Sequence, residues 1–308
     1  MDNKKLPLRI LVLGDIHGEI SSVGRVVMTV QQKRFDGIFL VGDIGVASLE
    51  NQRERASKIK NGIYRASVSC VFETLRELGA PIFYVPGNWD PKNIGLNLDQ
   101  VNNVDLNGEG HICKLGDFQI VGLGGSSSIG MNFPYEWPDK DMKDRIKKIF
   151  EGVVAWNKTI MISHDLPFRS KIDINVQKRH AGSKAVRELI KDFSPALCLA
   201  GHIHEGVGLD VVGESSLAVN AGSLLTKQTT DMHLSQRMVN LRVSYEEQFF
   251  VLEFFEFNRI VAEHFFFLGG RLMVRKYIKK EDGIFADTSQ GQQLLKPIEK
   301  ATKSPLKK

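Results

Sequence analysis

Seven side chains that can bind a metal ion follow short apolar runs of this chain. They are two carboxylates, one amide and four imidazoles: Asp15, Asp43, Asn88, His17, His164, His202 and His204. Mixed oxygen and nitrogen donors suit borderline to hard divalent ions such as Mn, Fe, Zn or Ni. Seven ligands are too many for a single tetrahedral ion. They are about right for two ions that share a bridging carboxylate.

Each of the five motifs that contain these residues is weak by itself. The motifs are, in chain order, DIHG, GD, GN, SH and GHIH. A lone histidine after a strand is more often a structural residue than a ligand, and glycine-rich turns such as Gly122–Gly125 more often relieve backbone crowding than bind phosphate. The interpretation as a metal centre therefore depends on the whole ordered set, in which every member ends an apolar run.

The apolar runs before the motifs have the character of buried strands. They are Leu8–Leu13, Ile38–Val41, Ile82–Val85, Thr159–Ile162 and Leu197–Ala200. Short runs that are apolar at both even and odd positions indicate strands buried on both faces of a sheet. Apolar stripes at helical spacing lie between them: Ile20–Val30, Ile63–Leu78, Met142–Phe150 and Val186–Phe193, the last with Ser183 as its N-cap.

This alternation of strands and helices predicts a layered α/β architecture. In such sheets ligands bind beyond the carboxyl ends of the strands, so residues far apart in the sequence can share one site. Further runs predict a second sheet that packs on the first: Ile112–Leu115, Phe118–Leu123, Val207–Val212 and Ser216–Asn220.

The chain changes character after about residue 240. Eight of the 18 phenylalanines lie between Phe249 and Phe267, and Gly269-Gly270 predicts a hairpin between two strands. We divide the chain into residues 1–240 as the main domain, 241–280 as an aromatic-rich β extension, and 281–308 as a basic, disordered tail. The extension is interpreted as core strands that cover one edge of the main domain. The alternative is a surface for a second copy or another partner.

Composition and charge exclude several classes of protein. The 308 residues are 42% apolar and 25% charged, and no apolar run reaches the roughly 18 residues that would indicate a membrane span. We expect a cytoplasmic protein with no membrane partner. The net charge is +5, but residues 291–308 carry +4 of it, so nucleic acid is not a favoured partner. Without CxxC spacing, the cysteines are expected to be free, buried thiols: Cys70, Cys113 and Cys198.

Taken together, the five motifs resemble those of the calcineurin-like metallophosphoesterase superfamily over about residues 8–225. The resemblance implies a two-sheet β-sandwich flanked by helices. It implies one ion bound by Asp15, His17 and His204, a second bound by Asn88, His164 and His202, and a bridge between them from Asp43. It also implies a nucleophilic hydroxide between the ions, with Asp43 and His164 as catalytic residues and Mn as the favoured metal.

The chain departs from this family at Gly87-Asn88-Trp89-Asp90. Many members have His after the metal-binding Asn, where it protonates the leaving group, whereas the indole of Trp89 has no suitable proton to give. The next residue, Asp90, either orients a ligand or caps a turn. A substitute acid is His180, in a segment that resembles an H-x-GS-x-x-x-R motif of some prokaryotic members. The alternative for His180 is the exposed, basic start of a helix.

Three functions remain open at this stage. The first is hydrolysis of small phosphodiesters, or of phosphomonoesters with good leaving groups. The second is a scaffold that keeps the fold without catalysis, for which Trp89 is the reason. The third is a nuclease, suggested by the isoelectric point of about 9.0 and made less attractive by the confinement of charge to the end of the chain.

Two segments near the motifs also have two interpretations each. The polar stretch Ser48–Lys60 is either a lid over the site or a solvated helix. The aromatic side chains of Phe133, Tyr135 and Trp137 either line a pocket or belong to an ordinary ordered loop.

Overall fold

The computed structural model describes residues 8–46, 62–128, 132–138, 146–147, 150–225, 228–234, 237–243, 247–256, 259–268, 271–280, 283–288 and 291–294. Three sequence predictions lie wholly or largely outside these ranges. They are the lid over Ser48–Lys60, the helix over Met142–Phe150 and the end of the basic tail after residue 294.

The larger of the two main sheets, sheet A, begins with parallel strands and continues with antiparallel ones. Its described strands are ordered β19-β18-β17-β16-β15-β1-β2-β3-β4. The parallel part consists of β1 (Leu8–Leu13), β2 (Gly37–Leu40), β3 (Ile82–Tyr84) and β4 (Val101–Asn103). The antiparallel part consists of β15 (Gln248–Glu256), β16 (Arg259–Leu268), β17 (Arg271–Lys280), β18 (Gly283–Thr288) and β19 (Gly291–Leu294).

The second main sheet, sheet B, has the order β11-β12-β10-β9-β6-β5 among the described residues. Its central strands are parallel and its two edge strands antiparallel. Their bounds are β5 (Cys113–Leu115), β6 (Phe118–Leu123), β9 (Thr159–Ser163), β10 (Leu197–Ala200), β11 (Gly208–Val212) and β12 (Ser216–Asn220). Two small sheets pair β7 (Ser126–Ser127) with β8 (Glu136–Trp137) and β13 (Gln228–Leu234) with β14 (Arg237–Val243).

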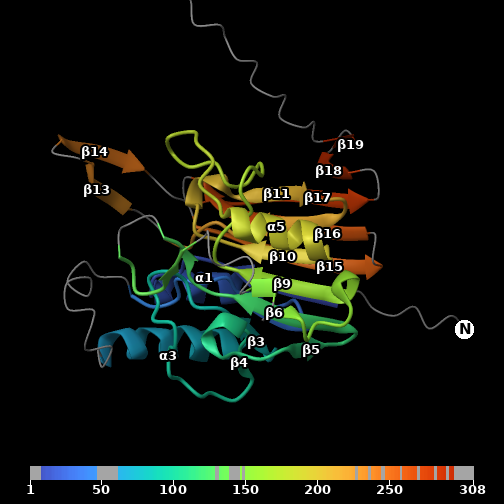
Figure 1. Ribbon diagram of the computed structural model, residues 1–308, viewed down its shortest axis with the longest axis horizontal. Coiled ribbons are helices and arrows are strands. Elements are labelled where there is room, and N and C mark those ends of the chain that lie inside the picture. The colour runs from blue at the N-terminus through green and yellow to red at the C-terminus, as the bar shows by residue number, and fades with distance from the viewer. Residues whose placement is uncertain are drawn as a thin grey trace, which may run out of the picture.

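In the described part of the chain, three helices cover the outer faces of these sheets, and short 3-10 turns lie in the loops (Figure 1). The helices are α1 (Ile20–Val30), α3 (Gly62–Arg76) and α5 (Lys184–Phe193), and the turns are η1 (Leu106–Gly108), η2 (Trp156–Lys158) and η3 (His204–Gly206). Apolar side chains of α1 and α3 pack on sheet A, and those of α5 pack on sheet B. A third apolar cluster lies between the sheets. The predicted sandwich of two sheets flanked by helices is therefore confirmed.

The sequence explains where these helices form. In α1 a stripe of valines is buried, as the helical spacing predicts: Val23, Val26, Val27 and Val30. The predicted N-cap of α5 is confirmed, because Ser183 Oγ accepts a hydrogen bond from the backbone N of Val186 at 3.2 Å. This helix ends at Ser194, whose backbone is left-handed.

The aromatic segment completes sheet A. Strand β15 pairs antiparallel with β1, and successive phenylalanines point to opposite faces, with Phe249 in the cluster under the helices and Phe250 in the cluster between the sheets. The predicted hairpin across Gly269-Gly270 joins β16 to β17. The sheet also extends into the segment assigned to the tail, because β18 pairs with β17 and β19 pairs with β18. Ile284 of β18 is buried in the core between the sheets.

The cysteines follow the prediction in part. All three are free, and Cys198 is buried, but Cys70 is exposed on α3 and Cys113 is half-buried. Its position on the outer side of an amphipathic helix explains the exposure of Cys70. None of the described helices combines the length and the apolar character needed to cross a membrane.

One buried imidazole in sheet A gives a pH-dependent stability. His264 is 4% exposed, its ring stacks on Phe250 with centroids 4.6 Å apart, and Nε2 donates to Gln248 Oε1 at 2.9 Å. Burial, with a smaller contribution from Arg275, lowers the pKa of His264 to about 4. The unfolded chain, with an ordinary histidine pKa of about 6.5, therefore binds a proton that the folded chain does not between these two values.

We expect the free energy of unfolding to fall as the pH falls from 6.5 to 4, by up to about 3 kcal/mol from this residue. His264→Gln keeps a hydrogen-bond donor without the titrating group, so its urea-unfolding curve should lose that part of the pH dependence. The measurement is urea unfolding at pH 7.5, 5.5 and 4.5, with His111→Gln at an exposed position as the control. Equal pH slopes in His264→Gln and the parent protein would contradict the assignment.

Candidate metal centre

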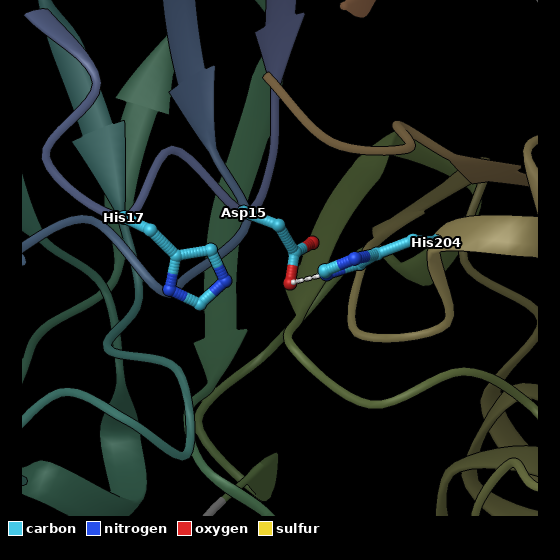
Figure 2. A group of neighbouring side chains, drawn as sticks. All are labelled: Asp15, His17 and His204. Atoms are coloured by element: carbon cyan, nitrogen blue, oxygen red, sulfur yellow. Dashed lines mark hydrogen bonds and ion pairs between the residues drawn. The ribbon is translucent and has the colours of Figure 1, made fainter. Parts of the chain in front are cut away.

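The five motifs lie where strands of both sheets end at the same edge of the sandwich. Asp15 and Asp43 follow β1 and β2 of sheet A, and His164 and His204 follow β9 and β10 of sheet B. Asp15 joins the two sheets through its carboxylate. Its Oδ2 accepts from the backbone N of His202 at 2.9 Å, and its Oδ1 lies 3.0 Å from His204 Nε2. Figure 2 shows this carboxylate between the rings of His17 and His204.

The backbone at this edge is strained. Four of the seven predicted ligands have left-handed backbone conformations: Asp15 (φ 47°), His17 (φ 48°), Asp43 (φ 51°) and His202 (φ 71°). This conformation costs a residue with a side chain on the order of 1–2 kcal/mol, and glycine would adopt it without that cost. Such strain clusters at functional sites, because there the side chain itself is needed.

Glycines of the GD, GN and GHIH motifs make room for neighbouring ligands. A Cβ atom on Gly42 would lie 2.4 Å from His164 Nδ1, and one on Gly87 would lie 2.1 Å from Asp43 Oδ1. A Cβ atom on Gly201 would lie 2.5 Å from Asp15 Oδ2. Each of these three glycines is thus required by the ligand of another motif, which explains why the motifs occur as a set.

Several atoms that carry lone pairs converge around His164 Nε2. His164 Nδ1 lies 2.8 Å from the carbonyl oxygen of Val41, so in the neutral ring Nδ1 carries the proton and Nε2 presents a lone pair. That Nε2 lies 2.8 Å from Asn88 Oδ1 and 3.7 Å from Asp43 Oδ2, which are acceptors too. Acceptors gathered in this way suit a cation, so the donor set fits a metal ion.

Asp43 occupies the position expected of a bridge. Its Oδ2 lies 3.7 Å from His17 Nε2, a predicted ligand of the first ion, and 3.7 Å from His164 Nε2, a predicted ligand of the second. Two groups of donor atoms lie within 4.8 Å of one another in the described chain: Asp15 with His17 and His204, and Asp15 with Asp43 and His164. Asp15 therefore belongs to both groups, whereas the sequence analysis assigned it to the first ion alone.

The other two predicted ligands border the second group. Asn88 lies against His164, and the ring of His202 is 4.9 Å from the ring of His164 in an edge-on arrangement. Two buried polar atoms here have no hydrogen-bond partner in the described part of the chain, His17 Nδ1 and Asn88 Nδ2. Unsatisfied atoms of this kind are uncommon in a protein interior, and they fit a site whose polar groups serve a ligand.

The pKa values of the two acids, Asp15 and Asp43, are shifted in opposite directions. Burial, Asp15 and Asp90 raise the pKa of Asp43 well above its ordinary range. Burial alone would also raise the pKa of Asp15, but His204, and to a smaller extent His164 and His17, outweigh it and lower that pKa. Two buried carboxylates at this spacing cannot both be charged without positive charge beside them.

The histidines differ in the same way. Burial lowers the pKa of His17 and of His202 to about 3, so both rings are neutral near pH 7 and present a lone pair. Burial also opposes charge on His204, but Asp15 outweighs it and raises the pKa of that ring. Asp15 and His204 thus each favour the charged form of the other, across a separation of 3.0 Å.

Asp90 fixes two of the ligand-bearing loops. This fully buried carboxylate accepts hydrogen bonds from the backbone N of Ile44 at 3.0 Å and of Gly87 at 2.8 Å, and from Tyr64 Oη at 2.7 Å. Ile44 follows Asp43, and Gly87 precedes Asn88. Both sequence interpretations of Asp90 therefore apply: it caps its own turn through Gly87 and holds the loop of Asp43 through Ile44.

Other predicted residues have mixed outcomes. The ring of Phe133 lies 4.9 Å from Trp89, which borders His17. Tyr135 and Trp137 are instead buried, and they hydrogen-bond to Asp105 and to the carbonyl of Gly124.

His180 lies in the loop between β9 and α5, where its Nδ1 is 2.6 Å from Asp173 Oδ1. The sequence analysis missed Asp173, because an isolated acid seven residues before a histidine has no distinctive pattern.

The comparisons with known proteins agree with this geometry. A family model described as a metallophosphoesterase of the calcineurin superfamily matches residues 1–243. The chain belongs to that superfamily. An uncharacterized protein of Methanocaldococcus jannaschii is 31% identical over 156 residues, which are 49% of this chain and 68% of the relative.

Among solved structures, TT1561 of Thermus thermophilus matches this metallophosphoesterase fold with a TM-score of 0.52 at 18% identity. The match covers 87% of this chain and 98% of that one, and at such identity it shows the fold alone. Metallophosphoesterases of this superfamily use divalent metals, and the described donor groups are candidates to hold them.

We predict that Asp90→Asn weakens metal binding by about 10- to 100-fold, as is typical when a partner that orients a ligand is removed. Asn offers one carbonyl oxygen in place of the two carboxylate oxygens that hold the loops of Asp43 and Asn88. The measurement is titration of the metal-free protein with Mn²⁺ in a calorimeter.

Asp105→Asn is the matched control. Asp105 is another buried carboxylate that accepts from a tyrosine hydroxyl, Tyr135 Oη at 2.8 Å, and from a backbone N, Gly124 at 2.9 Å. It should lose stability with little change in metal affinity. Equal losses of affinity in both variants would show that Asp90 has only a structural role.

Proposed function

We propose that this chain is a metal-dependent phosphoesterase that hydrolyses small phosphodiesters, or phosphomonoesters with good leaving groups. The observation that carries the proposal is the position of Asp43 Oδ2, at equal distances of 3.7 Å from His17 Nε2 and His164 Nε2. A carboxylate oxygen so placed can serve two ions at once. The proposed cofactor is a pair of divalent ions, with Mn favoured over Fe, Zn or Ni.

The residues of the cluster have separate tasks in this proposal. One ion would be held by Asp15, His17 and His204. The other would be held by Asn88, His164 and His202. Asp43 would contact both ions. Bound there, the two ions would neutralise phosphate oxygens and acidify water, which makes attack on an anionic ester feasible. The Val41 carbonyl fixes the ring of His164 through Nδ1, and the backbone N of Trp89 donates to Asp43 Oδ1 at 2.9 Å. These contacts orient both side chains before a substrate arrives.

The substrate preference follows from the residue after Asn88. The indole of Trp89 cannot protonate a departing alkoxide, and proton donation of this kind typically contributes about 10²- to 10⁴-fold to a rate. Esters whose leaving oxygen is already stable as an anion lose the least rate when no residue donates a proton. We therefore favour diesters and monoesters with acidic leaving groups.

Asp43→Asn should lower kcat for an aryl phosphodiester by at least about 10²- to 10³-fold, since it removes the charge that both ions would share. It should also lower the content of both ions. The measurements are Mn²⁺-dependent hydrolysis of bis(4-nitrophenyl) phosphate, with and without a chelator, and elemental analysis. Asp99→Asn, at an exposed position, is the control. Full metal content and near-parental turnover in Asp43→Asn would reject the shared bridge, and activity that a chelator leaves intact would reject metal dependence.

We further propose His180 as the proton donor that substitutes for the missing histidine. Its support is the contact of His180 Nδ1 with Asp173, a fully buried carboxylate that also accepts from the backbone N of Arg169 at 2.9 Å and of Gly182 at 3.2 Å. A carboxylate at Nδ1 orients the ring, so Nε2 is the ring nitrogen left to pass a proton to the leaving oxygen. The His180 side chain is 41% exposed, so it can meet a ligand.

His180→Ala should lower the rate for alkyl phosphoesters by about 10²-fold or more, and that for 4-nitrophenyl esters by only a few-fold. The reason is that 4-nitrophenolate leaves without a proton. The measurement is kcat for a series of esters with increasing leaving-group pKa. The decrease of kcat with leaving-group pKa should be steeper in the variant than in the parent protein. His111→Ala should leave the series unchanged. A uniform loss across the series in His180→Ala would assign His180 to binding or structure instead.

A further inference from the structure

A row of aromatic rings leads away from the predicted ligands. The ring of His17 is 5.9 Å from that of His204 on one side and 6.3 Å from the indole of Trp89 on the other. The indole in turn lies 4.9 Å from the ring of Phe133. These three contacts join motifs of distant sequence position, so the row exists only in the folded chain.

The outer end of the row is more exposed than the buried acids. Trp89 and Phe133 are half-buried, whereas the His17 side chain is only 6% exposed and Asp15, Asp43, Asn88 and His164 are buried. The row thus runs from the buried cluster, through His17, to the more exposed rings of Trp89 and Phe133. The part of a bound ligand that stays outside the cluster would have the indole and the phenyl ring beside it.

The backbone that carries the indole is held in place by hydrogen bonds. The backbone N of Trp89 donates to Asp43 Oδ1 at 2.9 Å, and the next residue is the buried Asp90 that joins two loops. Phe133 differs from its aromatic neighbours, since Tyr135 and Trp137 are buried and hydrogen-bond into the protein. The ring of Phe133 instead contacts the indole of Trp89, while its backbone N donates to Glu136 Oε2 at 3.2 Å.

We propose that Trp89 and Phe133 form an aromatic wall that selects phosphoesters whose alcohol part carries a planar aromatic ring. The assignment rests on the proposed function, because it takes the phosphate to lie at Asp43 and its neighbours. An indole offers a flat, polarisable face and no transferable proton, so its contribution is binding and not acid catalysis. Trp89, which stands where many members of the family have a proton-donating His, thereby supplies specificity for the leaving group.

The test compares two phosphonates that cannot be hydrolysed, because carbon replaces the ester oxygen. Phenylphosphonate and cyclohexylphosphonate have similar size and the same charged group, and only the first is planar. Their dissociation constants are measured by calorimetry on the Mn²⁺-loaded protein. We expect phenylphosphonate to bind about three- to tenfold more tightly, the range for an aromatic contact beyond the area that it buries.

Variants then assign the preference to the wall. Trp89→Leu should bring the ratio of the two dissociation constants close to one, Phe133→Leu should lower it, and Trp89→Phe, which keeps a ring, should retain most of it. Trp156→Leu is the control, because it removes a half-buried indole that stacks on Phe193 at 4.4 Å, in the core outside the row. Thermal unfolding curves show whether each variant is folded.

The outcomes separate the two proposals. A ratio near one in the parent protein, or an unchanged ratio in folded Trp89→Leu, overturns the aromatic wall while phosphonate binding still supports the metal centre. If neither phosphonate binds the Mn²⁺-loaded protein, the proposed function falls and the wall falls with it. A preference that disappears in Trp89→Leu and survives in Trp89→Phe supports the assignment.

Discussion

The organisation of this protein depends on the presence of two buried carboxylates, Asp15 and Asp43, in one small space. Removing one carboxylate from water costs several kcal/mol even after the protein relaxes, and two carboxylates cost roughly twice as much. Positive charge nearby must offset this cost. His204 supplies part of it to Asp15, as the lowered pKa of Asp15 indicates. The pKa of Asp43 is raised instead, so its charge is the one that the protein alone leaves uncompensated.

The rest of the fold keeps these groups together against their repulsion and strain. Backbone hydrogen bonds join the ligand loops pairwise, from His17 N to the Asp43 carbonyl at 2.8 Å and from Gly201 N to the His164 carbonyl at 3.1 Å. Ser223 Oγ donates to the Asp15 carbonyl at 3.0 Å, which ties the end of sheet B to the first loop of sheet A. Left-handed residues persist only where surrounding contacts determine the backbone in this way.

The sequence predicts the parts of the structure that repeat a simple pattern. The strand Leu8–Leu13 and the cap at Ser183 have local signals, and the structure contains both with the predicted bounds or contact. The pairing of Phe133 with Trp89 and of Asp173 with His180 had no such signal, because each depends on how two loops meet in three dimensions. Strands β18 and β19 were missed because their short, polar sequence runs directly into the lysine-rich residues that follow, and together these resemble a tail. Their strand character depends on the pairing of β18 with β17 and of β19 with β18.

The same physics explains why the ligands are readable in the sequence and the substrate is not. Gly42, Gly87 and Gly201 have no side chain because one would collide with a ligand, so sterics and charge together confine the motifs to a few residue types. No comparable constraint acts on Trp89 and Phe133, which are half-buried and lie outside the group of buried acids. Residues at such positions can change without disturbing the cluster. Differences in substrate between chains of this fold are therefore expected to lie there, beside an unchanged set of ligands.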